Sequence, residues 1–525
     1  MNYFNKLTIS SVFLTLLISM PALLLLSNIF SSSDNWSHLV DTVLFEYVFN
    51  SLYIMFGVAL LTSVIGFSTA YITSLFTFTG SKFFHYALIL PFAIPTYIVS
   101  YVYGGMFDIT GSVTTFILNL IDKDLSEVYF FDIMSIEGAI IVMSLVLYPY
   151  VYLISKTYLK SESSSIIDAS KTFGFTNFQI FYKVIIPISR PAIVAGVILA
   201  VMEAVADFGV MDYYGVSTFV TGIFRTWFGL GSVEDASKLA SMLMLFIFIL
   251  IFLEKYQRKN IRYRSAGKDF KPITKEKLKG YKNVLAFIIC FIPFFLGFLL
   301  PFTQMSYWFY LSYESTISEE FLTVFYQTLF LGVTTSVLIT FLAFIFTFNI
   351  RVHKSKLADY LTQISKLGYS IPGAVVAVGI LSFFLLINQT LDILLVGSIV
   401  AVIFGYVVRF LAISINNYES GFSKIPQTYD DACKTMNLGS FRTFYKVILP
   451  LIKNSIIASL IIVFIEVIKE LPLTMILRPF NFDTLAVLSH ELVGQAQVVE
   501  SSVPAMFIVV LGIISVLILA NKMKD

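Results

Sequence analysis

Four acidic residues lie inside long apolar runs, where an ionisable side chain is costly and usually functional. Their spacing is regular, because four positions separate Glu203 from Asp207 and also separate Glu466 from Glu470. On a helix, an i, i+4 spacing places both members of a pair on one face. Hard cations prefer carboxylate oxygens as ligands. The two pairs therefore predict an anionic lining that binds a passing cation weakly, because tight ligation would trap the ion.

A structural role for the same four acids stays open. Lys469 lies beside Glu470 in the sequence, and Arg225 is a further basic residue that could pair with a buried acid. The two cysteines, Cys290 and Cys433, lie far apart, so neither a disulfide framework nor a CxxC metal site is available. We therefore assign no metal ligands firmly and expect no cofactor.

Several kinds of chemistry are absent from the sequence. It contains no GxxxxGK[ST] phosphate loop, no nucleophile elbow, no HExxH helix and no zinc-binding cluster. We therefore expect no ATP hydrolysis by this chain and no enzymatic activity. The net charge of +2 gives no bulk attraction to nucleic acid.

The elements that position the acids are membrane helices. The chain has 525 residues, of which 57% are hydrophobic and 13% charged, whereas a soluble domain carries about 25% charged residues. Lipid must therefore solvate much of the chain, which excludes a soluble enzyme. Runs long enough to span a bilayer lie near residues 8–30, 47–76, 83–106, 136–155, 187–210, 239–254, 283–303, 321–350, 362–388, 392–412, 449–471 and 503–521. The sequence predicts an all-α polytopic membrane protein of about twelve transmembrane helices, with a kink at Pro372-Gly373.

The distribution of lysine and arginine predicts the orientation. Placing both termini in the cytoplasm puts 30 of the 35 basic residues on the cytoplasmic side, in agreement with the positive-inside rule. The first apolar run is longer than the core of a signal peptide, so we expect an uncleaved first helix.

The two halves of the chain repeat each other. Residues 168–187 read DASKTFGFTNFQIFYKVIIP and residues 431–450 read DACKTMNLGSFRTFYKVILP, with eleven of twenty positions identical at an offset of 263. The same offset relates the two acidic pairs. Each copy follows an even number of spans, so the halves are expected to be parallel and pseudo-symmetric. We place the first half at 1–253, a basic cytoplasmic linker at 254–282 and the second half at 283–525.

The first copy of the repeated segment predicts a helix–turn–helix elbow on the cytoplasmic side. Gly174 permits the reversal that ends a first helix. Thr176 and Gln179 can form a capping box that begins a second helix. Two such elbows, related by the repeat, would suit a two-fold symmetric cytoplasmic partner.

The repeated segments resemble the EAA loop of ABC-importer permeases, here at 165–187 and 428–450. In that family the loop supplies the helices that couple the permease to its ATP-hydrolysing subunits. The second copy departs from the pattern, because Asn437 stands where the glycine belongs and Gly439 follows two positions later. The resemblance assigns ATPase coupling to Asp168, Ala169, Ser170, Gly174, Asp431, Ala432, Cys433 and Gly439.

Three further stretches look like the ferric-iron branch of these permeases. They begin at Glu203 (EAVADFG), at Thr221 (TGIFRTWFG) and at Lys469 (KELPLT). The resemblance implies a fused two-half permease in the bacterial inner membrane that imports ferric iron. Its partners would be two ATP-hydrolysing subunits, an external substrate-binding protein and the lipid bilayer, with no nucleic acid.

Two alternatives to iron import stay open. The first keeps the architecture and changes the cargo to thiamine, a polyamine or an oxyanion. The second is an ion-coupled secondary transporter, which suits intramembrane acids but leaves the duplicated elbows unexplained.

Overall fold

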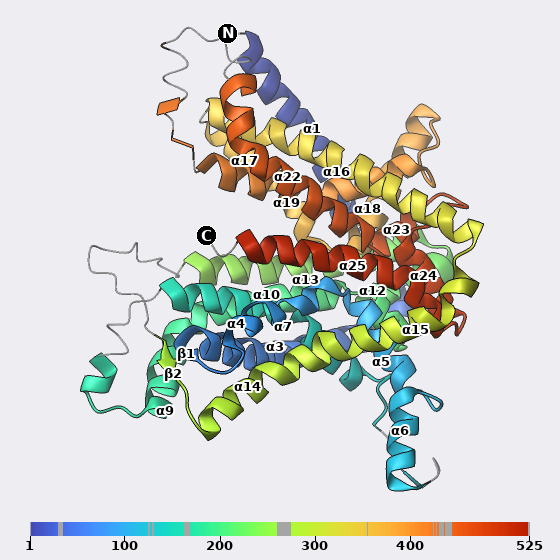
Figure 1. Ribbon diagram of the computed structural model, residues 1–525. Helices are drawn as coiled ribbons and strands as arrows, with labels where there is room; N and C mark the ends of the chain where they lie inside the picture. Colours follow the sequence, from blue (N-terminus) through green and yellow to red (C-terminus); the bar gives the residue numbers. More distant parts are fainter. Residues whose placement is uncertain are drawn as a thin grey trace. The chain divides into compact units, whose positions relative to one another are not determined.

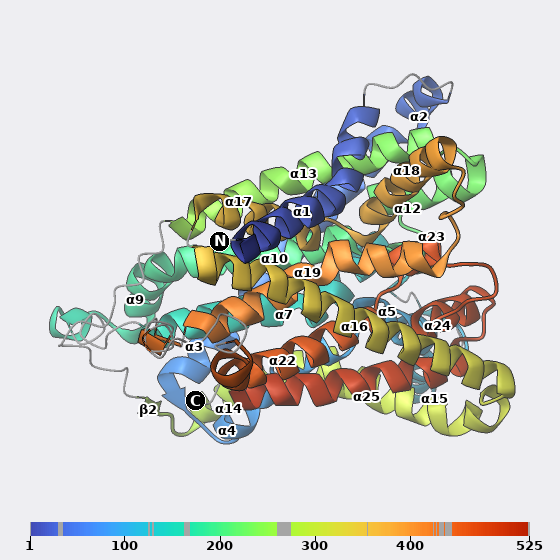
Figure 2. The same cartoon turned by 90° about the horizontal axis from the view of Figure 1, so that it is seen from above.

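The protein is described from a computed structural model (Figures 1 and 2). The residues that it describes are 2–29, 35–123, 127–128, 131–161, 169–259, 275–353, 355–423, 425–426, 428–429, 435 and 444–522.

Within the described residues, twelve helices are long and apolar enough to cross a membrane, which confirms the predicted all-α polytopic fold. These spans are Lys6–Asn28, Leu44–Leu75, Thr96–Ile121, Ile136–Lys160, Phe178–Ala206, Val233–Leu253, Tyr281–Thr316, Glu319–His353, Gly373–Leu391, Ile399–Ser423, Tyr445–Ile468 and Val498–Ile518.

The chain forms two compact units that do not follow the order of the sequence. Unit 1 comprises 1–34, 223–242 and 317–488, and unit 2 comprises 35–222, 243–316 and 489–525.

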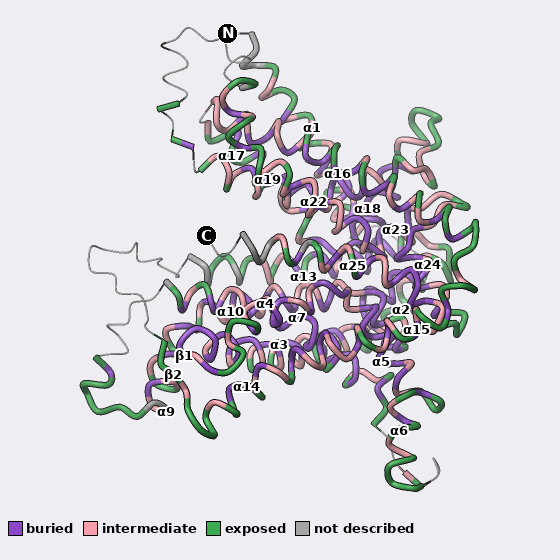
Figure 3. Tube along the Cα trace, viewed as in Figure 1, coloured by how far each residue is buried: buried purple, intermediate pink, exposed green. Residues whose placement is uncertain are grey.

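The core of unit 2 is three long helices that pack on one another, α3 (Leu44–Leu75), α7 (Ile136–Ser161) and α10 (Ile186–Ala206). Gly66 of α3 and Gly196 of α10 both lie against α7, and a Cβ on either would come within 2.6 Å of an α7 atom. Small residues permit this close helix packing, as is common within membranes. Figure 3 shows α7 as one of the most buried helices of this unit.

Unit 2 contains further elements beside these three helices. They are α2 (Trp36–Thr42), β1 (Phe76–Thr77), α4 (Ser81–Ala87), η1 (Leu90–Ala93), α5 (Thr96–Phe107), α6 (Ser112–Ile121), α9 (Asn177–Ile180), η3 (Phe181–Ile185), α11 (Gly209–Tyr213), β2 (Glu276–Lys277), α14 (Tyr281–Phe294), η5 (Phe295–Leu299), α15 (Leu300–Thr316) and α25 (Val498–Lys522).

Unit 1 is built around the packing of three helices, α16 (Glu319–His353), α19 (Ile399–Ser423) and α22 (Leu449–Ile468). The first helix of the chain, α1 (Asn2–Asn28), packs on α18 (Gly373–Leu391). Ser241, which lies on the span Val233–Leu253, donates its hydroxyl to the carbonyl oxygen of Leu25 at 2.6 Å.

The other elements lie in unit 1 or have residues in both units. They are short helices and one long span. They are α12 (Phe219–Phe224), η4 (Arg225–Gly229), α13 (Val233–Lys259), α17 (Lys356–Ser365), η6 (Leu367–Ser370), η7 (Phe444–Ile448), α23 (Pro472–Leu477) and α24 (Leu485–Gly494).

Each unit contains the first span of the half of the sequence to which most of its other helices do not belong. Unit 1 contains α1 together with helices of the second half, and unit 2 contains α14 and α15 together with helices of the first half. Both exchanged segments open their own half. The exchange is therefore reciprocal, as expected for a duplicated chain.

The predicted break at Pro372 is present, because η6 ends at Ser370 and α18 begins at Gly373. The first half has the same break, which we did not predict. There η1 ends at Ala93 and α5 begins at Thr96, directly after Pro95. An Ile-Pro pair lies in each break, directly before the next helix. The proline disfavours helical backbone at the isoleucine before it. The third span is therefore Thr96–Ile121, rather than the expected run near 83–106.

Candidate functional site

The first elbow has the predicted local structure where it is described. Backbone bonds from Phe173 N–H to the Ala169 carbonyl and from Phe175 N–H to the Ser170 carbonyl close the helical turn, at 3.0 and 3.1 Å. Gly174 adopts φ +78°, the left-handed conformation that ends the turn. Among the described residues other than its two chain neighbours, none has an atom within 4 Å of the position that a Cβ would take on Gly174. Its left-handed backbone conformation is therefore what favours glycine.

The capping box that begins the second helix of the elbow is also formed. Thr176 N–H donates to Gln179 Oε1 at 2.9 Å, and Gln179 N–H donates to Thr176 Oγ1 at 3.3 Å. These reciprocal bonds satisfy two of the free N–H groups at the start of α9. The predictions for Gly174, Thr176 and Gln179 therefore agree with the described geometry.

The elbow separates its aromatic side chains into an inner and an outer set. Phe181 is the inner one, packing on Tyr71 of α3 with ring centroids 4.6 Å apart. The outer ones are largely exposed, with Phe173 at 81%, Phe178 at 76% and Tyr182 at 66%. We call Phe173, Phe178 and Tyr182 the elbow patch. An exposed aromatic patch of this kind is typical of a protein interaction site.

A brace that we did not predict joins the end of the linker to this region. Strand β2 pairs in parallel with β1, which directly follows α3. Lys275 Nζ donates to the Thr73 carbonyl at 2.6 Å, and burial together with Lys160 lowers the pKa of Lys275. Glu276 lies 3.9 Å from Lys171 of the elbow, a half-exposed pair that contributes little stability.

The other predicted coupling residues cannot be placed. Asp168 of the first elbow and Asp431, Ala432, Cys433 and Gly439 of the second lie outside the described residues. Of the predicted coupling set, the structure describes Ala169, Ser170 and Gly174, and Ser170 is buried while the other two are exposed.

Asp207 lies at the junction between α10 and the short helix α11. Its Oδ1 accepts the backbone N–H of Val210 at 3.0 Å, and its Oδ2 accepts the hydroxyl of Thr96. A carboxylate at a helix start satisfies free N–H groups and interacts favourably with the helix dipole. Asp207 therefore caps α11 and ties it to the first residue of α5.

Glu470 makes the corresponding contacts in unit 1, where it is buried between α22 and the short helix α23. Its carboxylate accepts the backbone N–H groups of Leu473 and Thr474, each at 3.1 Å, and the Thr474 hydroxyl at 3.0 Å. Arg409 of α19 adds an ion pair at 2.7 Å. Glu470 thus caps α23 as Asp207 caps α11.

A glycine makes room for the ion pair of unit 1. A Cβ on Gly373 would collide with Arg409 Nη1 and Glu470 Oε1. Gly373 is the first residue of α18, as Thr96 is the first residue of α5. The partners from other helices therefore differ, because Thr96 of α5 contacts Asp207 whereas Arg409 of α19 contacts Glu470.

The remaining predicted acids occupy different surroundings. Glu466 pairs with Lys469 one turn later at 2.7 Å, with 25% and 32% of the two side chains exposed. Glu203 is half-buried on α10. Glu203 and Asp207 belong to unit 2, whereas Glu466 and Glu470 belong to unit 1. Within the described residues no group of three His, Cys, Asp or Glu side chains could hold a metal ion.

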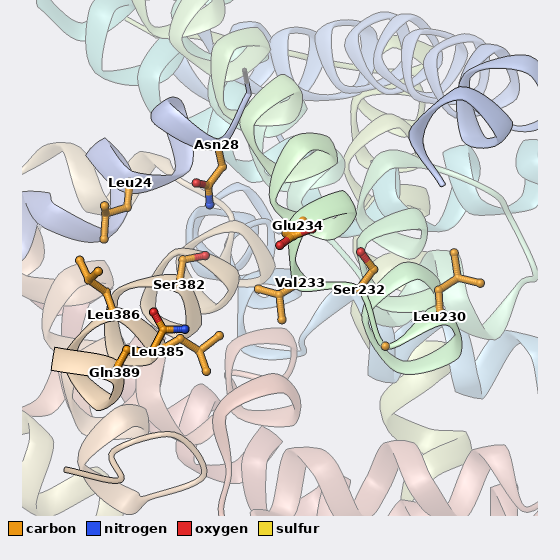
Figure 4. A pocket seen from close by; sticks show the side chains of 11 residues that line it. Leu24, Asn28, Leu230, Ser232, Val233, Glu234, Ser382, Leu385, Leu386 and Gln389 are labelled. Atoms are coloured by element: carbon orange, nitrogen blue, oxygen red, sulfur yellow. The ribbon is translucent and has the colours of Figure 1, made fainter. Parts of the chain in front are cut away.

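A groove of about 650 Å³ lies in unit 1 (Figure 4). Leucines such as Leu24 line it, together with the polar side chains of Asn28, Glu234, Ser382 and Gln389. None of the four predicted acids lines this groove, so it is not the anionic lining that the sequence predicts.

Comparison with known proteins matches most of the chain to transport permeases. Residues 63–262 and 339–523 match the family described as "Binding-protein-dependent transport system inner membrane component". The Fe(3+)-transport system permease protein FbpB 2 of Haemophilus influenzae is 23% identical over 90% of this chain and 89% of its own length. The ferric transport system permease protein FbpB of Actinobacillus pleuropneumoniae is 25% identical over 79% of this chain and 62% of its own. The spermidine/putrescine transport system permease protein PotB of Haemophilus influenzae is 26% identical over 41% of this chain and 79% of its own.

Proposed function

Because the chain belongs to the family of binding-protein-dependent transport system inner membrane components, we propose that it is the fused permease of an ATP-driven importer of ferric iron. It is a multi-pass protein of the inner membrane, and we place both termini in the cytoplasm on the distribution of lysine and arginine. An external binding protein delivers the cargo. Two ATP-hydrolysing subunits dock at the two elbows.

The observation that supports ferric iron as the cargo is the extent of similarity to relatives named for ferric transport. The relative FbpB 2 aligns with 90% of the chain and so includes both halves, whereas PotB aligns with 41%. The intramembrane acids fit a cation better than an oxyanion. A polyamine is also a cation, so it is the second candidate.

The positions of the acids and the elbows suggest how ATP hydrolysis is coupled to transport. ATP-driven closure of the two ATPase subunits would move the elbows and, through α10 and α22, the junctions that Asp207 and Glu470 cap. We propose that Asp207 and Glu470 fix these junctions, while Glu203 and Glu466, one turn earlier, remain the candidates for contact with passing cargo. The halves 1–253 and 283–525, with the basic linker between them, stay our proposal for the duplicated parts of the permease. Because each compact unit contains helices of both halves, the two units, and not the two halves, would be its moving arms.

The experiment that tests the function is ferric-iron uptake by proteoliposomes that hold this chain, its ATPase subunit and its binding protein. We expect uptake to require internal ATP and to withstand an excess of thiamine or spermidine. Uptake that spermidine abolishes would move the assignment to a polyamine. Uptake without any ATPase subunit, and lost with the ion gradient, would instead identify a secondary transporter.

Gly174→Val tests the coupling role of the first elbow. A β-branched residue in the left-handed conformation costs about 1–2 kcal/mol, enough to remodel the turn that presents the elbow patch. We expect binding-protein-stimulated ATP hydrolysis to fall about tenfold or more, the factor that corresponds to about 1.4 kcal/mol, with membrane insertion intact.

Gly397→Val is the matched control for this substitution. Gly397 has φ +69°, in the same left-handed region as Gly174, and among the described residues other than its chain neighbours none has an atom within 4 Å of its Cβ position. A valine is therefore strained at Gly397 for the same reason as at Gly174. It lies between α18 and α19, in a connection that the proposed topology places on the external side, whereas the elbow is cytoplasmic. Equal losses of stimulated hydrolysis in both variants would contradict the coupling role.

A further inference from the structure

Three polar side chains meet in unit 2 that the function described so far does not use. His490 of α24 lies between Asp212 of α11 and Tyr101 of α5. Its Nε2 is 3.3 Å from Asp212 Oδ2, and its Nδ1 is 2.5 Å from the Tyr101 hydroxyl. The segments are distant in the sequence, so this cluster forms only in the folded unit.

The cluster is fixed on one side and open on the other. Tyr101 is buried and T-shaped against Tyr213, with ring centroids 4.9 Å apart. The His490 side chain is 11% exposed, and Phe208 packs against its ring. The Asp212 side chain, in contrast, is 41% exposed. Solvent therefore reaches the cluster from the Asp212 side.

The donor atoms have the separation that one metal ion requires. Metal–nitrogen and metal–oxygen bonds of about 2.1 Å would bring an ion to His490 Nε2 and Asp212 Oδ2 together, with an angle of about 100° at the ion. That angle fits neighbouring positions of octahedral or tetrahedral coordination. Metal-binding histidines are oriented by a hydrogen bond at the other ring nitrogen, and Tyr101 provides that bond here.

Further carboxylates make the surroundings attractive to a cation. Asp207 and Asp212 both act electrostatically on the Tyr101 hydroxyl, and Asp108 acts on Tyr213.

We propose that Asp212 and His490 form a two-ligand transit site for the cargo cation, with Tyr101 as the residue that positions the imidazole. The proposal rests on the proposed import of ferric iron and adds a place where the chain first holds that ion. In the proposed topology α11 and α24 lie on the external side. Water or the cargo's own chelating ligands fill the remaining coordination positions. Two protein ligands bind weakly enough to release the ion inward.

Binding of ferric iron to the purified full chain in lipid nanodiscs tests the site. The probe is radiolabelled ferric citrate, with gallium citrate as a redox-inert check. We expect Asp212→Asn and His490→Gln each to weaken binding at least tenfold, and the double variant to be little worse than either, because both ligands serve one ion. Tyr101→Phe keeps the ring and removes the hydroxyl, and we expect about a tenfold loss of affinity.

Two matched controls exclude a general effect of charge or of histidine. Asp392→Asn removes an exposed carboxylate after α18, at a left-handed position that asparagine tolerates. His38→Gln removes an exposed histidine on α2. Both should bind ferric citrate as the wild type does.

A structural role for the pair predicts a different result. If Asp212 and His490 only join α11 to α24, their variants will unfold at a lower temperature but keep the full stabilisation by iron. Our proposal predicts that the rise in unfolding temperature on adding ferric citrate disappears in these variants. Wild-type-like binding in both variants would overturn it.

The nanodisc binding assay and the proteoliposome uptake assay together separate this proposal from the proposed function. Iron uptake by the wild-type transporter together with unchanged iron binding in Asp212→Asn refutes the site and keeps the importer. Site-dependent iron binding without iron uptake supports the site and refutes iron as the transported cargo.

Discussion

Replacing Phe178 with alanine is expected to weaken docking of the ATPase subunit at the first elbow by about 2–4 kcal/mol, the range typical of a central aromatic interface residue. Phe178 is 76% exposed on α9, whereas the neighbouring Phe181 makes the contacts with the inner rings of Phe67 and Tyr71. Its loss should therefore abolish most binding-protein-stimulated ATP hydrolysis while the unfolding temperature of the chain stays unchanged. Affinity of the purified ATPase subunit for the permease in nanodiscs measures the effect directly.

Two other phenylalanines control for this substitution. Phe181→Ala removes the inner ring that packs on Tyr71 and Phe67, so it should lower the stability of the chain by about 3–5 kcal/mol. Phe56→Ala removes a ring of α3 that is 71% exposed within a membrane span, where lipid covers it, so coupling should persist. Normal ATPase affinity in Phe178→Ala would show that the elbow patch is not the docking surface.

The elbow could be predicted because its signals are local. Gly174, Thr176 and Gln179 specify a turn and a cap within six residues, and the repeat marks the segment as one under a particular constraint. The brace at Lys275 and Glu276 could not be predicted in this way. It pairs two-residue strands that lie 200 positions apart. Neither a hydrophobic period nor a turn residue indicates so short a contact in the sequence.

The number of membrane spans could be predicted from the sequence, but their first and last residues were predicted less well. Hydropathy reports that a segment is apolar, but it does not report whether lipid or another helix covers it. The exchange of α1 into unit 1 therefore has no signal in composition. The break at Pro95 has the same Ile-Pro pair as the break at Pro372, and comparing the two halves around these prolines would have found it.

The repeat predicted that Asp207 and Glu470 are equivalent, and both cap a short helix after a long one. Their partners were not predictable, because Thr96 and Arg409 come from other helices that only the fold brings near. The cluster of Tyr101, Asp212 and His490 was missed for the same reason. The spacing of residues along the sequence describes one helix at a time. These sites form where three helices meet, so the spacing does not reveal them.

Glu470→Gln is expected to be the most destabilising single substitution among the four acids. The carboxylate of Glu470 accepts bonds from two backbone N–H groups, the Thr474 hydroxyl and Arg409, using both oxygens. Glutamine has one acceptor oxygen, and its NH₂ group would face donors. Arg409, with 17% of its side chain exposed, would also lose its counter-charge. Breaking such a buried pair costs about 3–5 kcal/mol, which thermal unfolding of the purified chain would detect.

The same change one turn earlier gives the matched comparison. Glu466 pairs with Lys469 at the same 2.7 Å, but both side chains are partly exposed, so Glu466→Gln should cost at most about 1 kcal/mol. Removing both charges in Arg409→Met with Glu470→Gln should recover part of the lost stability, because no charge is then left buried alone. If Glu470→Gln and Glu466→Gln unfold at the same temperature, Glu470 is not the cap that holds α23 to α19. In that case Glu470 returns to the set of acids available for contact with cargo.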